Sequence, residues 1–298
     1  MGLQKEIWIN SIVGNLFADN TFMGRSIDHS AFVNNLTVHV PNAGAAPTVV
    51  KGRSEFPASV GQRTDSDLNY SISEFTTDPF RISNAEEVEL SYDKRESIIS
   101  ASRAALQEAV ANELIKAWVP ASFAKVVTTG DSVAAHMASA TGNRKAVTKA
   151  DILAVKKEFD KNNIPQEGRC MLMDYEMYNQ LLSALTESQA NAFLASADAQ
   201  KGIVGKLYGF DFYLRSKVLR VNQGGTSITS GTTATDGAGA LAWQTTCVSR
   251  AMGETSLFER EKDPAYYGDI VSALVRAGGK YVRTDKAGVV VLYQGTPA

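Results

Sequence analysis

The spacing of hydrophobic and polar positions changes several times along the chain, and each change predicts a different element. Residues 1–35 carry many apolar side chains without a regular period, so we interpret them as an arm that is ordered by packing on another surface. From Leu36 onward apolar and polar residues alternate, and the alternation returns near Tyr70 after a polar stretch. We predict one long β-hairpin with a polar, mobile tip, including an extended run at Thr48–Arg53 and a further strand at Phe80–Ser83. Such a hairpin buries too little apolar surface to be stable alone.

At Asp93 the period becomes helical. Asp93 and Glu96 have the spacing of a capping box, an apolar stripe then continues to Trp118, and Pro120 ends the helix. A helix of this length spans about 40 Å. We therefore expect a beam that connects separate parts of the molecule.

Beyond Pro120, helical and strand-like patterns alternate, which predicts a compact α/β region. The elements expected there are a helix beginning at Thr148 with Asp151 in its first turn, a strand at Cys170–Met173, a helix capped by Asp174, a strand from Phe210 to Leu214, a flexible Gly/Ser/Thr-rich loop at 224–239, a strand at Leu241–Val248, and a final hairpin-like pair at Tyr281–Arg283 and Val289–Tyr293.

The composition of the chain argues against several classes of function. The chain has 298 residues, of which 44% are hydrophobic, and this is enough for a sizeable core. The 30 Lys and Arg residues against 32 Asp and Glu residues leave a net charge of −2 without a basic stripe, which argues against sequence-reading of nucleic acid. The chain lacks an apolar stretch of the roughly 18 residues that a membrane span needs. Cys170 and Cys247 lie in apolar runs, so we expect buried, reduced thiols.

A search for chemistry yields only weak candidates. The segment Gly142–Lys145 has the wrong spacing for a phosphate loop. Asp65–Asp67 fits a solvated hairpin tip better than half of a metal site, and His136 is better explained as a structural or surface histidine than as a general base. Cys170 is interpreted as an inert core thiol. We therefore assign no catalytic, cofactor-binding or metal-binding residue, expect no cofactor, and do not expect an enzyme.

Four stretches, taken in order, resemble one protein family over nearly the whole chain. The first is LTVHVPNAGAAPTVVKG with SDLNYSISEFTTDPFRIS, the second is AEEVELSYDKRESIISASRAALQEAVANELIKAWVP, the third is GRCMLMDYEMYNQLLSA with GIVGKLYGFDFYLRSKV, and the last extends from ALAWQTTCVSRAMG to VVVLYQ. Their order and spacing resemble the major capsid proteins of tailed bacteriophages, a fold shared with herpesvirus capsid floors and encapsulin nanocompartments.

The resemblance implies an α+β fold with a defined order of parts. These are an N-terminal arm (1–35), an extended β-hairpin loop or E-loop (36–83), a peripheral domain with a long spine helix (84–122), an axial α/β domain (123–255), and a return to the peripheral domain (256–298).

It also implies a shell subunit of the virion that is made in the host cytoplasm. Copies would assemble through pentamers and hexamers into an icosahedral head around double-stranded DNA, which they would contact non-specifically. Separate scaffold, portal and decoration proteins are possible further partners, and no membrane is involved. The residues expected at contacts between subunits are Trp8, Phe17, Lys51, Arg53, Glu55, Tyr70 and Asp78.

Two other hypotheses stay open at this point. An encapsulin-type nanocompartment shell would have the same fold, although the long hairpin and arm favour a phage. An enzyme whose site is scattered over the fold would require acids, bases or a metal to converge in a cleft.

Overall fold

The computed structural model describes residues 21–34, 36–44, 46–54, 56–58, 60–83, 94–231 and 233–297. Most of the predicted arm, with Trp8 and Phe17, lies outside these residues. Glu55 and the expected helix cap Asp93 also lie outside them.

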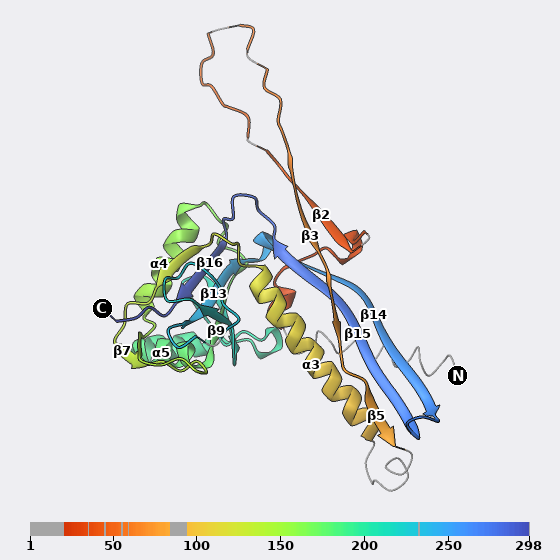
Figure 1. The fold of residues 1–298 in the computed structure, drawn as a ribbon. Helices are drawn as coiled ribbons and strands as arrows, with labels where there is room; N and C mark the ends of the chain where they lie inside the picture. Colours follow the sequence, from red (N-terminus) through yellow and green to blue (C-terminus); the bar gives the residue numbers. More distant parts are fainter. Residues whose placement is uncertain are drawn as a thin grey trace.

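A seven-stranded mixed sheet forms the rounded body of the molecule (Figure 1). Its strands are β6 (Ala124–Val127), β9 (Arg169–Asp174), β10 (Gly205–Leu207), β11 (Phe210–Arg215), β12 (Leu219–Val221), β13 (Gly237–Gln244) and β16 (Val289–Tyr293). The central strands β9, β13 and β16 are buried along their whole length, as expected for a sheet covered on both faces. The predicted strands at 170–173 and 210–214 are confirmed as parts of β9 and β11.

Helices cover one face of this sheet. They are α4 (Lys149–Lys161), α5 (Tyr175–Ala184) and α6 (Glu187–Ala195), and a small hairpin of β7 (Ser132–Ala134) and β8 (Asn143–Lys145) lies beside them. The predicted caps are present. Thr148 and Asp151 form a capping box at α4, and Asp174 accepts a hydrogen bond from the backbone of Met177 at α5. The sequence reading missed α6.

A five-stranded sheet and one long helix form the second body. Its elements are β1 (Ile27–Asp28), β4 (Ser73–Thr76), β5 (Phe80–Ser83), β14 (Val248–Asp263), β15 (Gly268–Tyr281) and α3 (Lys94–Ala117). Helix α3 lies along β15, as Figure 1 shows. The predicted beam is therefore confirmed, and its buried stripe includes Leu106, Val110 and Leu114. Ala105, an apolar residue next to this stripe, is exposed.

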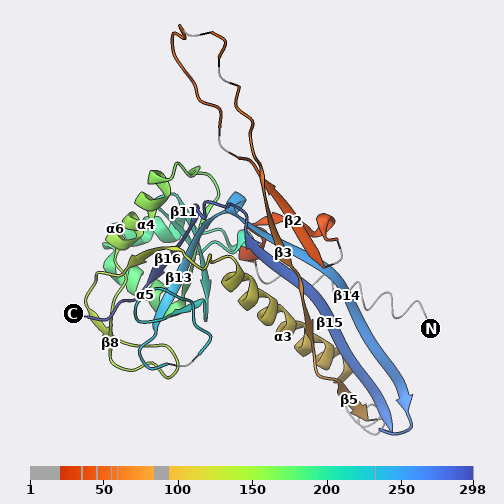
Figure 2. The same cartoon turned by 45° about the horizontal axis from the view of Figure 1, so that its top comes forward.

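Strands β2 (Thr37–Asn42) and β3 (Ser66–Ser71) form an antiparallel hairpin that projects from the two bodies (Figures 1 and 2). Four single-turn 3₁₀ helices complete the described chain, at Thr21–Gly24, Ser30–Phe32, Ala199–Lys201 and Thr245–Cys247.

Two sequence-based expectations about the hairpin are wrong. Thr48–Arg53 forms no strand, and its last residues include a turn at Lys51 and Gly52. Strand β5 does exist, but β4 and β5 pair with β15 instead of extending the hairpin. The β2–β3 ladder therefore ends at Ser71, and the chain then joins the five-stranded sheet.

The expectations for the last third of the chain are also partly wrong. Val289–Tyr293 pairs with β13 and β6 in the seven-stranded sheet, not with Tyr281–Arg283. The long β14–β15 ladder was not predicted, apart from Val248 and Tyr281, which pair at one end of it. The segment 224–239 is not a uniform exposed loop either, because β13 begins at Gly237 and the Asp236 side chain is buried.

Three aromatic side chains join the two bodies into one core. Trp118, directly after α3, and Trp243 of β13 have ring centroids 5.4 Å apart. Phe22 meets both rings edge-on, at 6.0 Å from Trp118 and 6.4 Å from Trp243. Both indole nitrogens are satisfied, because Trp118 donates to Ser249 O and Trp243 donates to Arg25 O, each at 2.8 Å.

Among the described residues, no helix is long and apolar enough to cross a membrane.

Replacing Gly279 by alanine is expected to lower the free energy of unfolding by about 1–3 kcal/mol. Gly279 lies where α3 approaches β15, and an added Cβ would stand 2.6 Å from Leu114 Cδ2 and 2.6 Å from Ser249 O. Urea denaturation followed by circular dichroism measures the change. Gly24→Ala is the control because its Cβ would have no heavy atom within 4 Å, so its effect should stay within about 0.5 kcal/mol. Equal effects of the two variants would contradict this account of the packing.

Candidate assembly surfaces

The base of the hairpin is fixed to the five-stranded sheet. Val38, Tyr70 and Ile72 form a small buried cluster with Ala251 of β14. The Tyr70 hydroxyl accepts a hydrogen bond from Ser249 Oγ at 3.2 Å. The alternating pattern of β2 and β3 is therefore explained by a local core, and the hairpin leaves the body in a defined direction.

Beyond this base, the tip loop (residues 43–65) carries large apolar side chains in solvent. Val49 is 92% exposed, Val60 is 99% exposed and Phe56 is 78% exposed. A monomer gains nothing from placing these side chains in water. Exposed apolar side chains gathered on one projecting element are typical of a surface that another chain covers.

The predicted contact residues fall in different places. Lys51 and Arg53 are exposed in the tip loop, and Asp78 is exposed between β4 and β5. None of these three forms an ion pair within the part of the chain that the structure describes. Tyr70 is only 8% exposed and packs inside its own subunit, so we do not carry it forward as a contact with a neighbour.

A groove of about 680 Å³ lies between the β4–β5 connection and α3. Phe75 and Phe80 line it on the strand side, and small residues such as Ala105 line it on the helix side. Asp78 lies in its wall. Sequence reasoning singled out Asp78 but not the groove, which exists only because β4 and β5 pair with β15.

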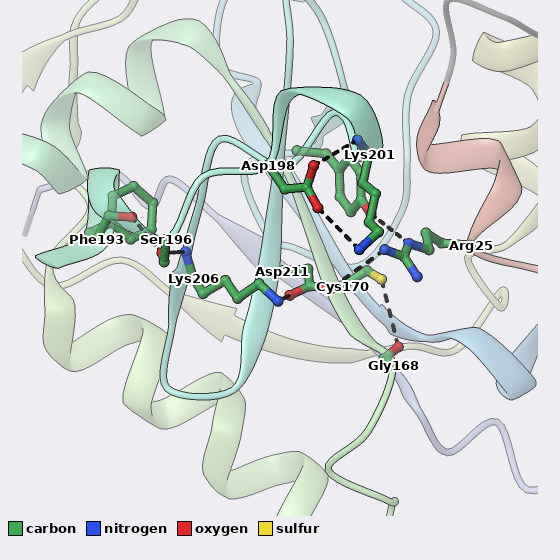
Figure 3. A network of polar contacts seen from close by, with 10 residues as sticks. Arg25, Gly168, Cys170, Phe193, Ser196, Asp198, Lys201, Lys206 and Asp211 are labelled. Carbon is green, nitrogen blue, oxygen red and sulfur yellow. Dashed lines mark hydrogen bonds and ion pairs between the residues drawn. The ribbon is translucent and has the colours of Figure 1, made fainter.

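Residues 21–34, here called the anchor segment, tie the start of the described chain to both bodies. Phe22 and Met23 are buried in the shared core. Arg25 Nε donates to the Tyr213 hydroxyl at 2.7 Å, and Arg25 also approaches Asp211 at 3.8 Å. The polar network around Arg25 and Asp211 is shown in Figure 3. Sequence analysis recognised the aromatic content of this region but not the residues that it contacts.

Two groups near Arg25 have strongly shifted pKa values. Burial raises the pKa of the Tyr213 hydroxyl to about 12, although the hydrogen bond from Arg25 opposes part of this shift. Burial likewise raises the pKa of the Cys170 thiol to about 12. A thiol with such a pKa stays protonated at neutral pH and is a poor nucleophile, which agrees with its interpretation as a core residue. Cys247 is also buried and free.

The far end of the β14–β15 ladder presents two further aromatic side chains that sequence analysis did not single out. Tyr266 is 52% exposed and Tyr267 is 77% exposed. The turn that carries them is ordered by Asp263, whose backbone oxygen accepts hydrogen bonds from both tyrosine N–H groups and whose side chain accepts one from Ala265.

Two projecting elements with exposed apolar or aromatic tips, and a groove between the β4–β5 connection and α3, are typical of surfaces that other chains cover. Residues 79–293, more than half of the chain, match the family of phage capsid proteins. The chain belongs to this family.

Solved structures agree with the fold. The capsid of cyanophage Pam1 superposes with a TM-score of 0.64 at 12% identity, over 91% of this chain and 89% of that one. The capsid of cyanophage P-SCSP1u superposes with a TM-score of 0.63 at 16% identity, over 90% of this chain and 86% of that one. A virus-like particle from Pyrococcus furiosus superposes with a TM-score of 0.56 at 9% identity, over 97% of this chain and 99% of that one. A search of curated proteins found no match.

The chain is thus a major capsid shell protein with a mixed helix-and-sheet fold, and both the resemblance and the α+β class are confirmed. It assembles with copies of itself into a shell and is located in the virion. The family match is to phage capsids, so the nanocompartment alternative is not better supported. A capsid family also points to a structural role rather than to catalysis.

Burial of the Tyr213 hydroxyl makes the free energy of unfolding depend on pH in the alkaline range. The pKa of a tyrosine in an unfolded chain is about 10, whereas burial raises the pKa of Tyr213 in the folded protein to about 12. The folded state therefore holds the Tyr213 proton more tightly than the unfolded state does. The resulting contribution to the free energy of unfolding is complete below pH 10 and is lost as pH rises towards 12. The urea midpoint of the native protein should fall over this interval.

Tyr213→Phe should lose less stability between pH 10 and 12 than the native protein, and a tyrosinate absorbance step near pH 12 should disappear. Tyr208→Phe is the matched control because Tyr208 is 37% exposed. If Tyr213→Phe and Tyr208→Phe behave alike, Tyr213 does not cause the pH dependence.

Proposed function

We propose that this chain is the repeating subunit of an icosahedral head that encloses double-stranded DNA, and that its copies assemble through pentamers and hexamers. The membership of the phage capsid family supports this proposal. In this assignment the seven-stranded body is the axial domain, the five-stranded sheet with α3 is the peripheral domain, and the β2–β3 hairpin is the E-loop.

The partners follow from the same proposal. The net charge of −2 favours weak, non-specific contact with packaged DNA, because a basic wall would bind phosphates at many sites. Scaffold, portal and decoration proteins would be separate chains, and the subunit would be made in the host cytoplasm before assembly.

The observation that carries the proposal is the exposed tip loop. Its apolar side chains extend beyond the base cluster, and burying each of them would contribute about 1.5–3 kcal/mol. We propose that the tip loop of one copy covers the peripheral surface of the next. Because each subunit would give and receive such a contact, modest contacts add up over the closed shell.

The groove beside α3 is the surface that we propose to receive the tip loop. Its wall contains apolar Phe75 and Phe80 and the acidic Asp78. The tip loop supplies apolar Val49 and Val50 next to basic Lys51. Apolar and charged groups are thus complementary between two copies.

Replacing Val49, Phe56 and Val60 together by serine is expected to block shell formation while the monomer stays folded. The three side chains are exposed in the subunit, so unfolding should change little. Negative-stain electron microscopy and sedimentation velocity measure the shells, and circular dichroism measures the fold. Leu153→Ser, at a side chain 50% exposed on α4, is the control and should assemble normally. An unchanged shell yield from the triple variant would sink the proposed role of the tip loop.

A charge-reversal experiment tests the proposed groove. Lys51→Glu with Arg53→Glu should raise the concentration needed for assembly, since each exposed ion pair contributes about 0.2–1 kcal/mol per contact. Adding Asp78→Lys should restore part of the loss. The control is Lys149→Glu with Lys157→Glu, which makes the same change of charge on α4. Failure of Asp78→Lys to restore assembly would place the receiving surface elsewhere.

A further inference from the structure

A cavity of about 500 Å³ lies at the carboxyl ends of the parallel strands β9 and β11. Asp174 ends β9 and Ser216 follows β11, and both line the cavity. Helix α3 closes another side with Lys116. In sheets with parallel strands this end is where ligands bind most often. Its volume lies within the range of small-ligand and peptide-side-chain pockets.

One wall of the cavity is a segment that its composition alone predicts to be flexible. Arg220 forms an ion pair with the buried Asp236 at 2.8 Å and donates to Ala138 O at 2.7 Å. Thr229 Oγ1 donates to the same Asp236 carboxylate at 3.0 Å. Residues 228–231, which line the cavity, are therefore held in place. Ordering a Gly/Ser/Thr-rich segment costs conformational entropy, and the buried ion pair offsets this cost.

A second wall contains a histidine with an unused nitrogen. His136 Nε2 lies 2.9 Å from Asp174 Oδ2, and both side chains are almost fully buried. The other ring nitrogen, Nδ1, is buried and has no hydrogen-bond partner among the described residues. Buried polar atoms are nearly always paired, so this nitrogen, in a side chain that lines the cavity, can accept a hydrogen bond from a bound ligand.

The free charge at the cavity is positive. Lys116 and Lys217 line it and form no ion pair with any residue in the described ranges. The carboxylates nearby are already engaged, Asp174 with His136 and Asp236 with Arg220. Between these groups the surface is aliphatic, with contributions from Met137, Val218, Leu219 and Ile228.

We propose that this cavity binds an acidic, apolar peptide segment of another protein. A carboxylate of the peptide pairs with Lys116 and Lys217, and an aliphatic side chain beside it packs on Val218 and Ile228. Nucleic acid fits the cavity less well, because strand binding needs cations and stacking rings that continue over several nucleotides, whereas the cavity offers, among the described residues, two lysines outside ion pairs and the half-exposed ring of Tyr175. This proposal is independent of how the tip loop acts in shell closure.

The first experiment uses 8-anilinonaphthalene-1-sulfonate, a fluorescent probe that joins an anionic group to apolar rings. Lys116→Glu with Lys217→Glu should weaken the tightest binding phase by about tenfold or more, because two attractive charges become repulsive. Val218→Trp, which fills the cavity without changing charge, should weaken it as well. Lys149→Glu with Lys157→Glu is the charge-matched control and should bind like the native protein.

Circular dichroism checks that each variant folds. One cavity variant changes charge and the other changes volume, so we do not expect the same folding defect in both. Native-like binding by both folded cavity variants would overturn the proposal, because the probe would then bind elsewhere.

The second experiment identifies the class of ligand by competition. The competitors are acetyl-Leu-Glu-Asp-Leu-amide, the same peptide with lysines in place of the two acids, and a ten-nucleotide thymidine strand. Displacement by the acidic peptide alone supports the proposal. Equal displacement by the basic peptide, or stronger displacement by the thymidine strand, overturns it.

Discussion

The contact of Phe22 with Trp118 and Trp243 is the interaction on which the rest of the structure depends. Trp118 belongs to the helix-and-sheet body and Trp243 to the seven-stranded body, and both are completely buried. Large aromatic side chains dominate core energetics, and both indole N–H groups have partners here. The two bodies therefore share one core. A shell subunit needs this, since strain at one contact must be carried through the whole subunit.

Sequence patterns predicted the helices and strands that are determined by residues close to one another in the chain. Leu106, Val110 and Leu114 recur at helical spacing, so α3 could be found without knowledge of its neighbours. Asp174 and Thr148 cap helices through contacts with the next few residues. The alternation of β2 and β3 was equally visible. The resemblance to phage capsid proteins rested on the order of these elements.

What sequence reasoning missed depends on partners far away in the chain. Val290 pairs with Ala124, more than 160 positions earlier, and nothing near Val290 indicates that partner. Asp236 stands in a Gly-rich run that predicts a loop, and its burial is explained by Arg220 and Thr229, which both bind its carboxylate. The hydroxyl of Tyr70 accepts a hydrogen bond from Ser249, and nothing in the sequence near Tyr70 indicates that partner. In each case the position of the residue depends on a partner elsewhere in the chain and not on the local composition.

The exposed tip loop also has a consequence for the subunit before it is incorporated into a shell. Val49, Phe56 and Val60 are in contact with water on a free subunit. Exposed apolar side chains on an extended segment favour non-specific association as well as the correct contact. The fraction of free subunits that aggregates should therefore rise with their concentration. Rapid incorporation into a growing shell would then protect the protein from aggregation, so the rate of synthesis and the rate of assembly have to be matched.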